Sequence, residues 1–204
     1  MAIDELKPLH GVIEPDVRSK MLEILDPEVG FRPVTLSDHH QEVAAIGLPA
    51  ALPAKLREQF EVSKNLLLYS WFVYRFIPVA EFHALSTLEL GLKLRFRLKK
   101  SPGLKGLIRR AIDEGLVTNE DFASYRNLVR SRREQWEMFR QISEASGSEI
   151  EPLEPPPDYL SKLLDSVPAL RNEYAHGSSL LHPHGIASLE VVADFLAAVF
   201  ADEN

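Results

Sequence analysis

The six residues from Arg171 to His176, followed by Gly177, hold side chains suited to chemistry on a phosphate group. The arginine guanidinium stays charged and binds phosphate oxygens through paired N–H groups. The imidazole of His176 can give or take a proton near neutral pH. Asn172 adds a small amide. Together, Arg171, Asn172 and His176 have the side chains to bind a phosphate, orient it and move a proton.

The spacing of these residues leaves two structural interpretations open. Arg171 and His176 are five positions apart, which places them about 140° apart on an ideal helix. They could line one groove if the helix frays at Gly177 or if a second copy supplies the other half. Alternatively, Arg171 forms a salt bridge with Glu173 or a nearby acid, and His176 caps the helix C-terminus, where a cation suits the helix dipole.

The pattern Arg-Asn-x-x-x-His closes a short helix and precedes a loop and a final apolar helix. It resembles the signature of the HEPN superfamily, and the resemblance covers about residues 60–200. It implies an all-α domain and a metal-independent endoribonuclease that acts as a dimer, in which two motifs form one composite site. The ribose 2′-hydroxyl would attack the adjacent phosphate. His176 would be the general base or acid, Arg171 would stabilise the developing charge, and Asn172 would position the phosphate or the imidazole.

The resemblance also implies partners and a biological setting. The partners are RNA, a second copy of the chain, and an antitoxin or a nucleotidyltransferase. The setting is phage defence, a toxin–antitoxin system or RNA processing. Some family members have a modified tyrosine two residues after the histidine, but this chain has Ser178 there, which argues against that mechanism.

The alternative is a catalytically silent HEPN-fold interaction or nucleotide-binding module. An enzyme should bring two motifs to a basic, open cleft. A silent module should pair Arg171 with an acid and bury His176.

The composition of the chain argues against several classes of protein. The 204 residues are 45% hydrophobic, which suffices for a packed core, and they include no cysteine, so no disulfide or thiolate zinc site is expected. A net charge of −7 argues against a general nucleic-acid coat protein. The start of the chain shows no signal-peptide pattern, and the most apolar stretch, 66–80, is too short and interrupted to span a bilayer. We therefore expect a cytoplasmic protein that does not enter the membrane.

Charge is unevenly spread along the chain. From Leu90 to Ile112 there are eight basic residues and no acid: Lys93, Arg95, Arg97, Lys99, Lys100, Lys105, Arg109 and Arg110. This segment either binds RNA locally or forms the solvated face and C-terminal turn of a helix. Glu81 and Glu89 precede it. They either face the motif and tune His176, or lie at a solvated edge and pair with Arg75 or Lys93.

The histidines do not form a convincing metal site. His39 and His40 are adjacent, and His182 and His184 lie in a loop with Pro183, but no carboxylate is placed beside either pair. The sequence also lacks a phosphate-binding loop and a nucleophile–histidine–acid order. We therefore expect neither a metal nor a cofactor.

The hydrophobic periodicity predicts a bundle of helices in residues 55–204, preceded by an arm of short helices in residues 1–54. The resemblance implies that this all-α bundle is HEPN-like. Within the arm, one helix is expected from Glu14 and another from Ser37 to Ile46. The first has its apolar residues on one face: Val17, Met21, Leu22 and Leu25. The pattern from 54 to 98 should bend or break near Pro78. Further helices are expected over 104–112, 118–143, 159–164, 168–176 and 186–200, with an exposed linker at 147–157. No strand is expected, and the apolar face of the last helix is the expected dimer interface.

Overall fold

The computed structural model describes residues 4–100, 102–146, 151–177, 181 and 183–203, and in this part of the chain the fold is all-α apart from one small hairpin. The helices are α1 (Leu36–Ala45), α2 (Ala54–Tyr69), α3 (Phe76–Arg95), α4 (Leu104–Asp113), α5 (Ala123–Ser146), α6 (Tyr159–Ala175) and α7 (Gly185–Val199). The short 3-10 turns are η1 (Leu9–Gly11), η2 (Ser19–Met21), η3 (Asn119–Asp121) and η4 (Ala201–Glu203). No helix of these described ranges is long and apolar enough to cross a membrane.

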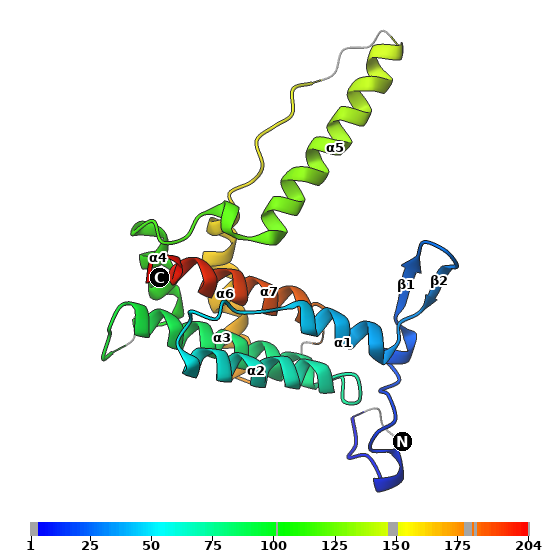
Figure 1. Cartoon of the computed structure of the whole chain (residues 1–204), viewed down its shortest axis with the longest axis vertical. Coiled ribbons are helices and arrows are strands. Elements are labelled where there is room, and N and C mark those ends of the chain that lie inside the picture. The colour runs from blue at the N-terminus through cyan, green and yellow to red at the C-terminus, as the bar shows by residue number, and fades with distance from the viewer. Residues whose placement is uncertain (1–3, 101, 147–150, 178–180, 182, 204) are drawn as a thin grey trace.

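Helix α3 is the centre of the bundle. It packs against α2, α7, α6 and α4 (Figure 1). Its buried residues include Ala84, Leu88 and Leu92, which recur every four positions as expected for a helix face turned to the core. Gly91 lets α3 approach α2 and α7, because a Cβ there would collide with the Leu196 side chain and touch Leu56. The site described below is built on this helix and the two that cross it, α6 and α7.

The break between α2 and α3 confirms the prediction made from Pro78. Residues 70–75 leave the helix, and Pro78 lies in the first turn of α3, where its missing N–H has no intrahelical partner to lose. The prediction of helix through Leu98 was too long, since α3 ends at Arg95 and Arg97 adopts a positive φ of 53°.

The N-terminal arm differs from the expectation. Glu23–Asp26 (β1) and Gly30–Pro33 (β2) pair as an antiparallel hairpin, so the prediction of no strand was wrong. The helix expected from Glu14 is also absent. Only the 3-10 turn η2 forms there, and Met21 and Leu25 are exposed. Helix α1 does form, but its N-cap is Thr35, whose side chain forms a capping box with Asp38.

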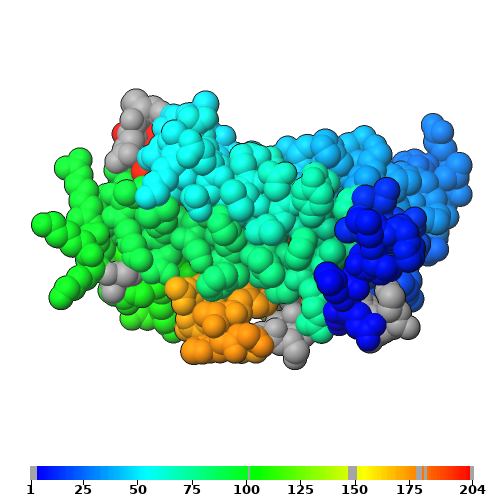
Figure 2. All heavy atoms as spheres, turned by 90° about the horizontal axis from the view of Figure 1, so that it is seen from below, coloured from blue at the N-terminus to red at the C-terminus, as the bar shows by residue number. Residues whose placement is uncertain are grey.

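The arm is fastened to the turn between α2 and α3. The backbone N–H of Asp16 donates to the Trp71 carbonyl at 2.9 Å, and the Asp16 carboxylate accepts from the Tyr74 N–H at 3.2 Å. Asp4 forms ion pairs with Arg18 and Arg75. Figure 2 shows the first residues (dark blue) at one end of the molecule and α6 (orange) on the face seen from below.

Helix α5 extends away from the bundle (Figure 1). The expected start signal at Thr118–Asp121 forms a capping box, but it caps η3, and Phe122 then takes an extended conformation before α5 begins. Tyr125, near the base of α5, is the only buried residue of this helix. Residues 151–157 return along α5 without regular structure, as the linker prediction had it, while residues 147–150 of that linker lie outside the described residues.

The final helix forms as predicted but does not present its apolar face. Leu189, Val192, Leu196 and Val199 of α7 are buried in the chain's own core. The prediction that this face is a dimer interface was therefore wrong, because α3 and α2 already cover it.

Candidate functional site

The candidate site lies in the second half of α6. This helix begins after Asp158, whose side chain accepts a hydrogen bond from the Ser161 N–H, and it continues without interruption to Ala175. The sequence predicted two helices separated at Asp165–Ser166, with Pro168 in the first turn of the second. Instead, Pro168 lies buried in the interior of one helix. The helix ends at His176, and Gly177 has a φ of 81°, which glycine adopts without strain.

Arg171 lies against α3 in a partly buried position. Its Nη2 donates to Oε2 of Glu89 at 3.3 Å, and its guanidinium carbon lies 5.7 Å from the centre of the Phe82 ring. About a third of its side chain is exposed. The Nε atom of Arg171 is buried and lacks a hydrogen-bond acceptor within the described part of the chain. Buried polar groups in proteins are usually hydrogen-bonded. The salt bridge to Glu89 alone therefore does not account for the position of the Arg171 guanidinium.

Glu89 is the acid that holds Arg171. It also accepts from Lys93 Nζ at 2.7 Å, four residues later on α3, as the sequence suggested. The two cations neutralise Glu89 and leave the surroundings of Arg171 with a net positive charge. Arg75, the other expected partner of these acids, pairs with Asp4 instead.

Arg171 and Asn172 line the same small pocket, together with Glu89, Pro168 and the start of α4. The pocket has a volume of about 190 Å³, and Gly103, Leu104 and Lys105 form its other wall. Lys105 is held at the edge by Asp165, with Nζ 2.8 Å from Oδ1. A guanidinium, an amide, an ammonium and the N-terminal end of a helix around one small cavity are groups that favour an anion.

His176 is exposed at the C-terminus of α6, and its backbone N–H donates to the Asn172 carbonyl. It does not belong to the residues that line the pocket with Arg171. The structure therefore brings Arg171 and Asn172 together within one chain and leaves His176 apart from them. Of the features expected of a silent module, the pairing of Arg171 with an acid is present and the burial of His176 is not.

Glu81 faces the motif, which was one of the two alternatives that the sequence left open, and it forms a buried polar cluster there with Tyr174 rather than with His176. Its side chain is fully buried, so neither the solvated edge nor the pairing with Arg75 was right. Tyr174 Oη donates to Glu81 Oε2 at 2.6 Å, and Ser188 Oγ donates to Oε1 at 2.5 Å. Burial raises the pKa of Tyr174, and the hydrogen bond to Glu81 raises it further. The available signal was an acid on the apolar face of α3, one position after Ala80 and four before Leu85.

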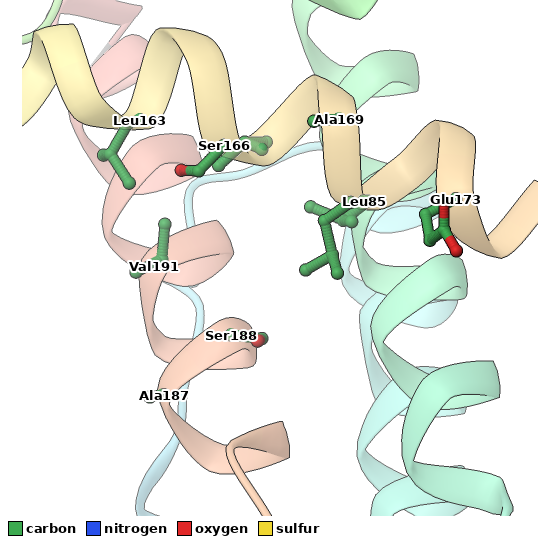
Figure 3. Close-up of a pocket in the computed structure, with 10 residues that line it drawn as sticks. Leu85, Leu163, Ser166, Ala169, Glu173, Ala187, Ser188 and Val191 are labelled. Atoms are coloured by element: carbon green, nitrogen blue, oxygen red, sulfur yellow. The ribbon is translucent and has the colours of Figure 1, made fainter. Parts of the chain in front are cut away.

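A larger pocket lies between α3, α6 and α7, with a volume of about 570 Å³ (Figure 3). Its lining is mostly apolar and includes Leu85, Leu163 and Val191. Among the described residues that line it, the polar ones are Ser166, Ser188 and Glu173, and of these only Glu173 is charged. This lining suits an apolar group and opposes a phosphate.

The segment with eight basic residues is partly neutralised. Lys93, Lys105 and Arg110 pair with Glu89, Asp165 and Glu114 respectively. The Arg110 guanidinium also stacks over the Phe96 ring, 4.2 Å from its centre. Two of these ion pairs are local to α3 and α4, Lys105 joins α4 to α6, and Arg110 packs on Phe96 where the end of α3 meets α4.

Of the adjacent histidines His39 and His40, His39 is held within the fold and His40 is exposed. His39 Nε2 lies 2.9 Å from the Leu67 carbonyl oxygen, and its ring stacks on Trp71. His182 and Ser178 lie outside the described residues. Within the described ranges, no three histidine or carboxylate side chains are grouped so that they could hold a metal ion.

No family model, curated protein or solved structure matches this chain.

Proposed function

We propose that this chain is a HEPN-like endoribonuclease that cleaves RNA without a metal and acts as a homodimer. The observation that supports it most is the arrangement at the end of α6. Arg171 and Asn172 share one pocket with Lys105, and the guanidinium keeps a buried donor that lacks an acceptor in the described ranges. This pocket would hold the phosphate that is cleaved.

The chemistry follows from the side chains. The ribose 2′-oxygen forms a bond to phosphorus as its proton passes to an imidazole, and the bond from phosphorus to the 5′-oxygen breaks as that oxygen gains a proton. Arg171 binds the phosphate oxygens and stabilises the charge of the transition state. Asn172 positions the phosphate. His176 lies outside the pocket of its own chain, so the proposal has the second copy supply the imidazole.

The biological setting is proposed from the same resemblance. It is phage defence, a toxin–antitoxin system or RNA processing in the cytoplasm, with an antitoxin or a nucleotidyltransferase as partner. A nucleotidyltransferase would modify a tyrosine two residues after the motif histidine, but this chain has Ser178 there. We therefore favour an antitoxin that binds the enzyme as the partner.

The test is cleavage of a mixed RNA pool by the purified chain. Arg171→Ala and His176→Ala should each lower the cleavage rate by about 100-fold or more, because each removes a group that acts in the transition state. Cleavage should persist in EDTA, leave 2′,3′-cyclic phosphate ends and spare DNA, which lacks the attacking hydroxyl. His10→Ala, which removes an exposed histidine of the arm, is the matched control and should cleave like the wild type. Equal cleavage by all variants would indicate a contaminating nuclease.

The second candidate is a catalytically silent interaction module, and the ion pair between Arg171 and Glu89 favours it. In that case the wild-type chain cuts no RNA, while Arg171→Ala and Glu89→Gln both lower the midpoint of urea unfolding. The nucleotide-binding form of this alternative has less support, because the described residues that line the larger pocket include the acid Glu173 and no base.

A further inference from the structure

A second basic pocket lies at the base of α5, where this helix meets the returning chain. It has a volume of about 550 Å³ and is lined by residues of η3, of α5 and of the segment 151–157. Three of the lining residues are arginines: Arg126, Arg130 and Arg133. Because they are four and three positions apart, they lie on one side of the helix. We call this cavity the arginine pocket.

The three arginines are not paired with acids. Among the residues that the structure describes, no carboxylate lies within ion-pair distance of their guanidinium groups. Arg126 donates instead to two backbone carbonyls of η3, and Arg130 donates to the Asn127 side chain. The acid Glu137, on the next turn of α5, forms its ion pair with Arg140. The positive charge of the pocket is therefore available to a ligand.

This arrangement favours a bound anion. Like charges on adjacent turns of a helix repel one another, and an anion between them relieves the repulsion. Glu120 is the only acid among the described residues that line the pocket, so three arginines and one glutamate give the lining a net charge of +2. The chain as a whole has a net charge of −7, so an anion is attracted to this pocket and not to the surface in general.

The walls of the pocket are held in place by the protein itself. Trp136 Nε1 donates to the Glu151 carbonyl at 3.0 Å, and Arg132 donates to the Glu154 carbonyl at 3.4 Å. These bonds hold the returning chain against α5, so that Pro156 forms one wall of the pocket. A site that is formed in advance needs less ordering when its ligand binds.

The lining suits consecutive phosphates of a nucleic-acid strand. A planar guanidinium binds phosphate oxygens through paired N–H groups. The three arginines are spread over about 10 Å of the helix, which is longer than one phosphate group. Val129 and Pro156 add apolar surface between the charges, against which a sugar or a base can pack.

A lipid surface fits this part of the molecule less well. Phe139 and Ile142 of α5 are exposed and could enter a bilayer. Their positions along the helix, however, place them on the side roughly opposite the three arginines. A bilayer therefore could not contact the apolar side chains and the arginine pocket at the same time.

We propose that the arginine pocket binds consecutive phosphates of an RNA strand and so holds the substrate beside the bond that is cleaved. The choice of RNA rests on the proposed function. Tyr125 of the pocket contacts the ring of Tyr159, the first residue of α6. Arg171 lies about 18 Å further along α6, a distance that several nucleotides span. The arginine pocket positions the RNA and takes no part in breaking the bond.

Binding of RNA without cleavage tests the pocket. The parent protein is His176→Ala, and the probe is a fluorescein-labelled single-stranded oligouridylate followed by fluorescence anisotropy at low salt. Adding Arg130→Gln and Arg133→Gln should raise the dissociation constant by about 10-fold or more. The slope of its logarithm against the logarithm of salt concentration should fall by about 1.4, because each phosphate contact with a single strand contributes about 0.7.

The matched control removes the same charge outside the pocket. Lys20→Gln together with Lys55→Gln changes two exposed residues and should alter the dissociation constant by less than about twofold, since salt screens distant charges. Arg133→Gln alone should give an intermediate loss. Its side chain is exposed and makes no hydrogen bond within the described residues, so this variant keeps the test valid if the double variant does not fold.

The possible outcomes separate the pocket from the cleavage reaction. Equal losses from the lysine pair and the arginine pair would overturn the proposal, because net charge alone would then explain binding. It would also be overturned if the parent bound no RNA, if UTP at equal phosphate concentration displaced the RNA, or if the arginines served to bind phosphatidylserine vesicles instead. A wild-type chain that cuts no RNA but binds it through Arg130 and Arg133 would refute the proposed cleavage and support the pocket.

Discussion

At the scale of single residues, the chemistry of this chain depends on carboxylates of α3 that hold residues of α6. Glu89 holds Arg171, and Glu81 accepts hydrogen bonds from Tyr174 and Ser188. Burial of a carboxylate is tolerated only where its oxygens are hydrogen-bonded. The end of α6 is therefore placed by polar contacts as well as by its apolar face.

Tyr174→Phe tests the buried cluster. It removes one donor to a fully buried carboxylate, so we expect the free energy of unfolding to fall by about 1–3 kcal/mol in urea titration. Tyr69→Phe is the matched control, because Tyr69 is more than half exposed, and it should change stability by less than about 0.5 kcal/mol. Equal stability of Tyr174→Phe and the wild type would show that the hydroxyl contributes nothing to the fold.

His83 gives a dependence of stability on pH. Burial lowers the pKa of His83, whose Nδ1 lies 2.9 Å from Ser63 Oγ. The unfolded chain, with a histidine pKa of about 6.5, then binds the proton more readily than the folded chain. Stability is therefore expected to fall as the pH drops from about 7.5 to about 5. In urea titrations across this range, His83→Asn should show a smaller loss than the wild type, and parallel curves would contradict the expectation.

The residues of the candidate site could be proposed from the sequence, but most of the contacts that these residues make could not. Residue types identified Arg171, Asn172 and His176, and the end of the helix at Gly177 was correct. That Glu89 faces the motif was one of the interpretations left open, but its contact with Arg171 was not predictable, because Glu89 lies 82 positions earlier in the chain and meets Arg171 only through the crossing of α3 and α6. Lys105 joined the same pocket for the same reason.

At the scale of elements, local signals predicted the helices that long-range packing did not override. Pro78 marked the division between α2 and α3, and Gly115, with a φ of 68°, marked the turn after α4. Pro168 misled the prediction, because apolar residues on both sides of it pack into the core and keep α6 continuous. The hairpin was missed because its strands have four residues each, which is too short for a clear alternation.

Gly91→Ala tests the packing of α3. Alanine favours a helix more than glycine, but the added Cβ would collide with the buried Leu196 side chain. We expect a loss of about 1–3 kcal/mol in the free energy of unfolding, as overpacking of a core causes. Leu196→Ala removes the atoms that collide, so the double variant should lose less than the sum of the two single losses. Strict additivity in this cycle would contradict the close approach of α3 and α7.

At the scale of the whole molecule, the chain consists of a bundle, the N-terminal arm and a projecting part, called the α5 segment, which is made of α5 and residues 151–157. Between residues 131 and 157, none of the described residues is buried. At the base of the α5 segment the two ends are held together, because Ser124 Oγ and Tyr159 Oη are 2.6 Å apart and the rings of Tyr125 and Tyr159 are in contact. Residues of the α5 segment can therefore be replaced or removed without altering the core.

Replacement of residues 131–156 by a short glycine–serine linker should leave a folded bundle. We expect cooperative thermal unfolding, followed by circular dichroism, because the buried residues of α2, α3, α6 and α7 are all retained. A broad, non-cooperative transition would show that the α5 segment folds together with the bundle as one unit.

The position of α7 in the chain affects the order of events during synthesis. The surface of α3 that includes Leu88 and Leu92 is complete at Arg95, but α7, which covers much of it, begins at Gly185. At about 5–20 residues per second, the 89 residues from 96 to 184 take about 5–20 s to translate. During this interval a nascent α2–α3 pair would expose the apolar side chains that α7 covers in the complete fold. We therefore expect a ribosome-bound chain that is stalled before Gly185 to recruit chaperones that bind apolar surface, and a chain released after Phe200 to escape them.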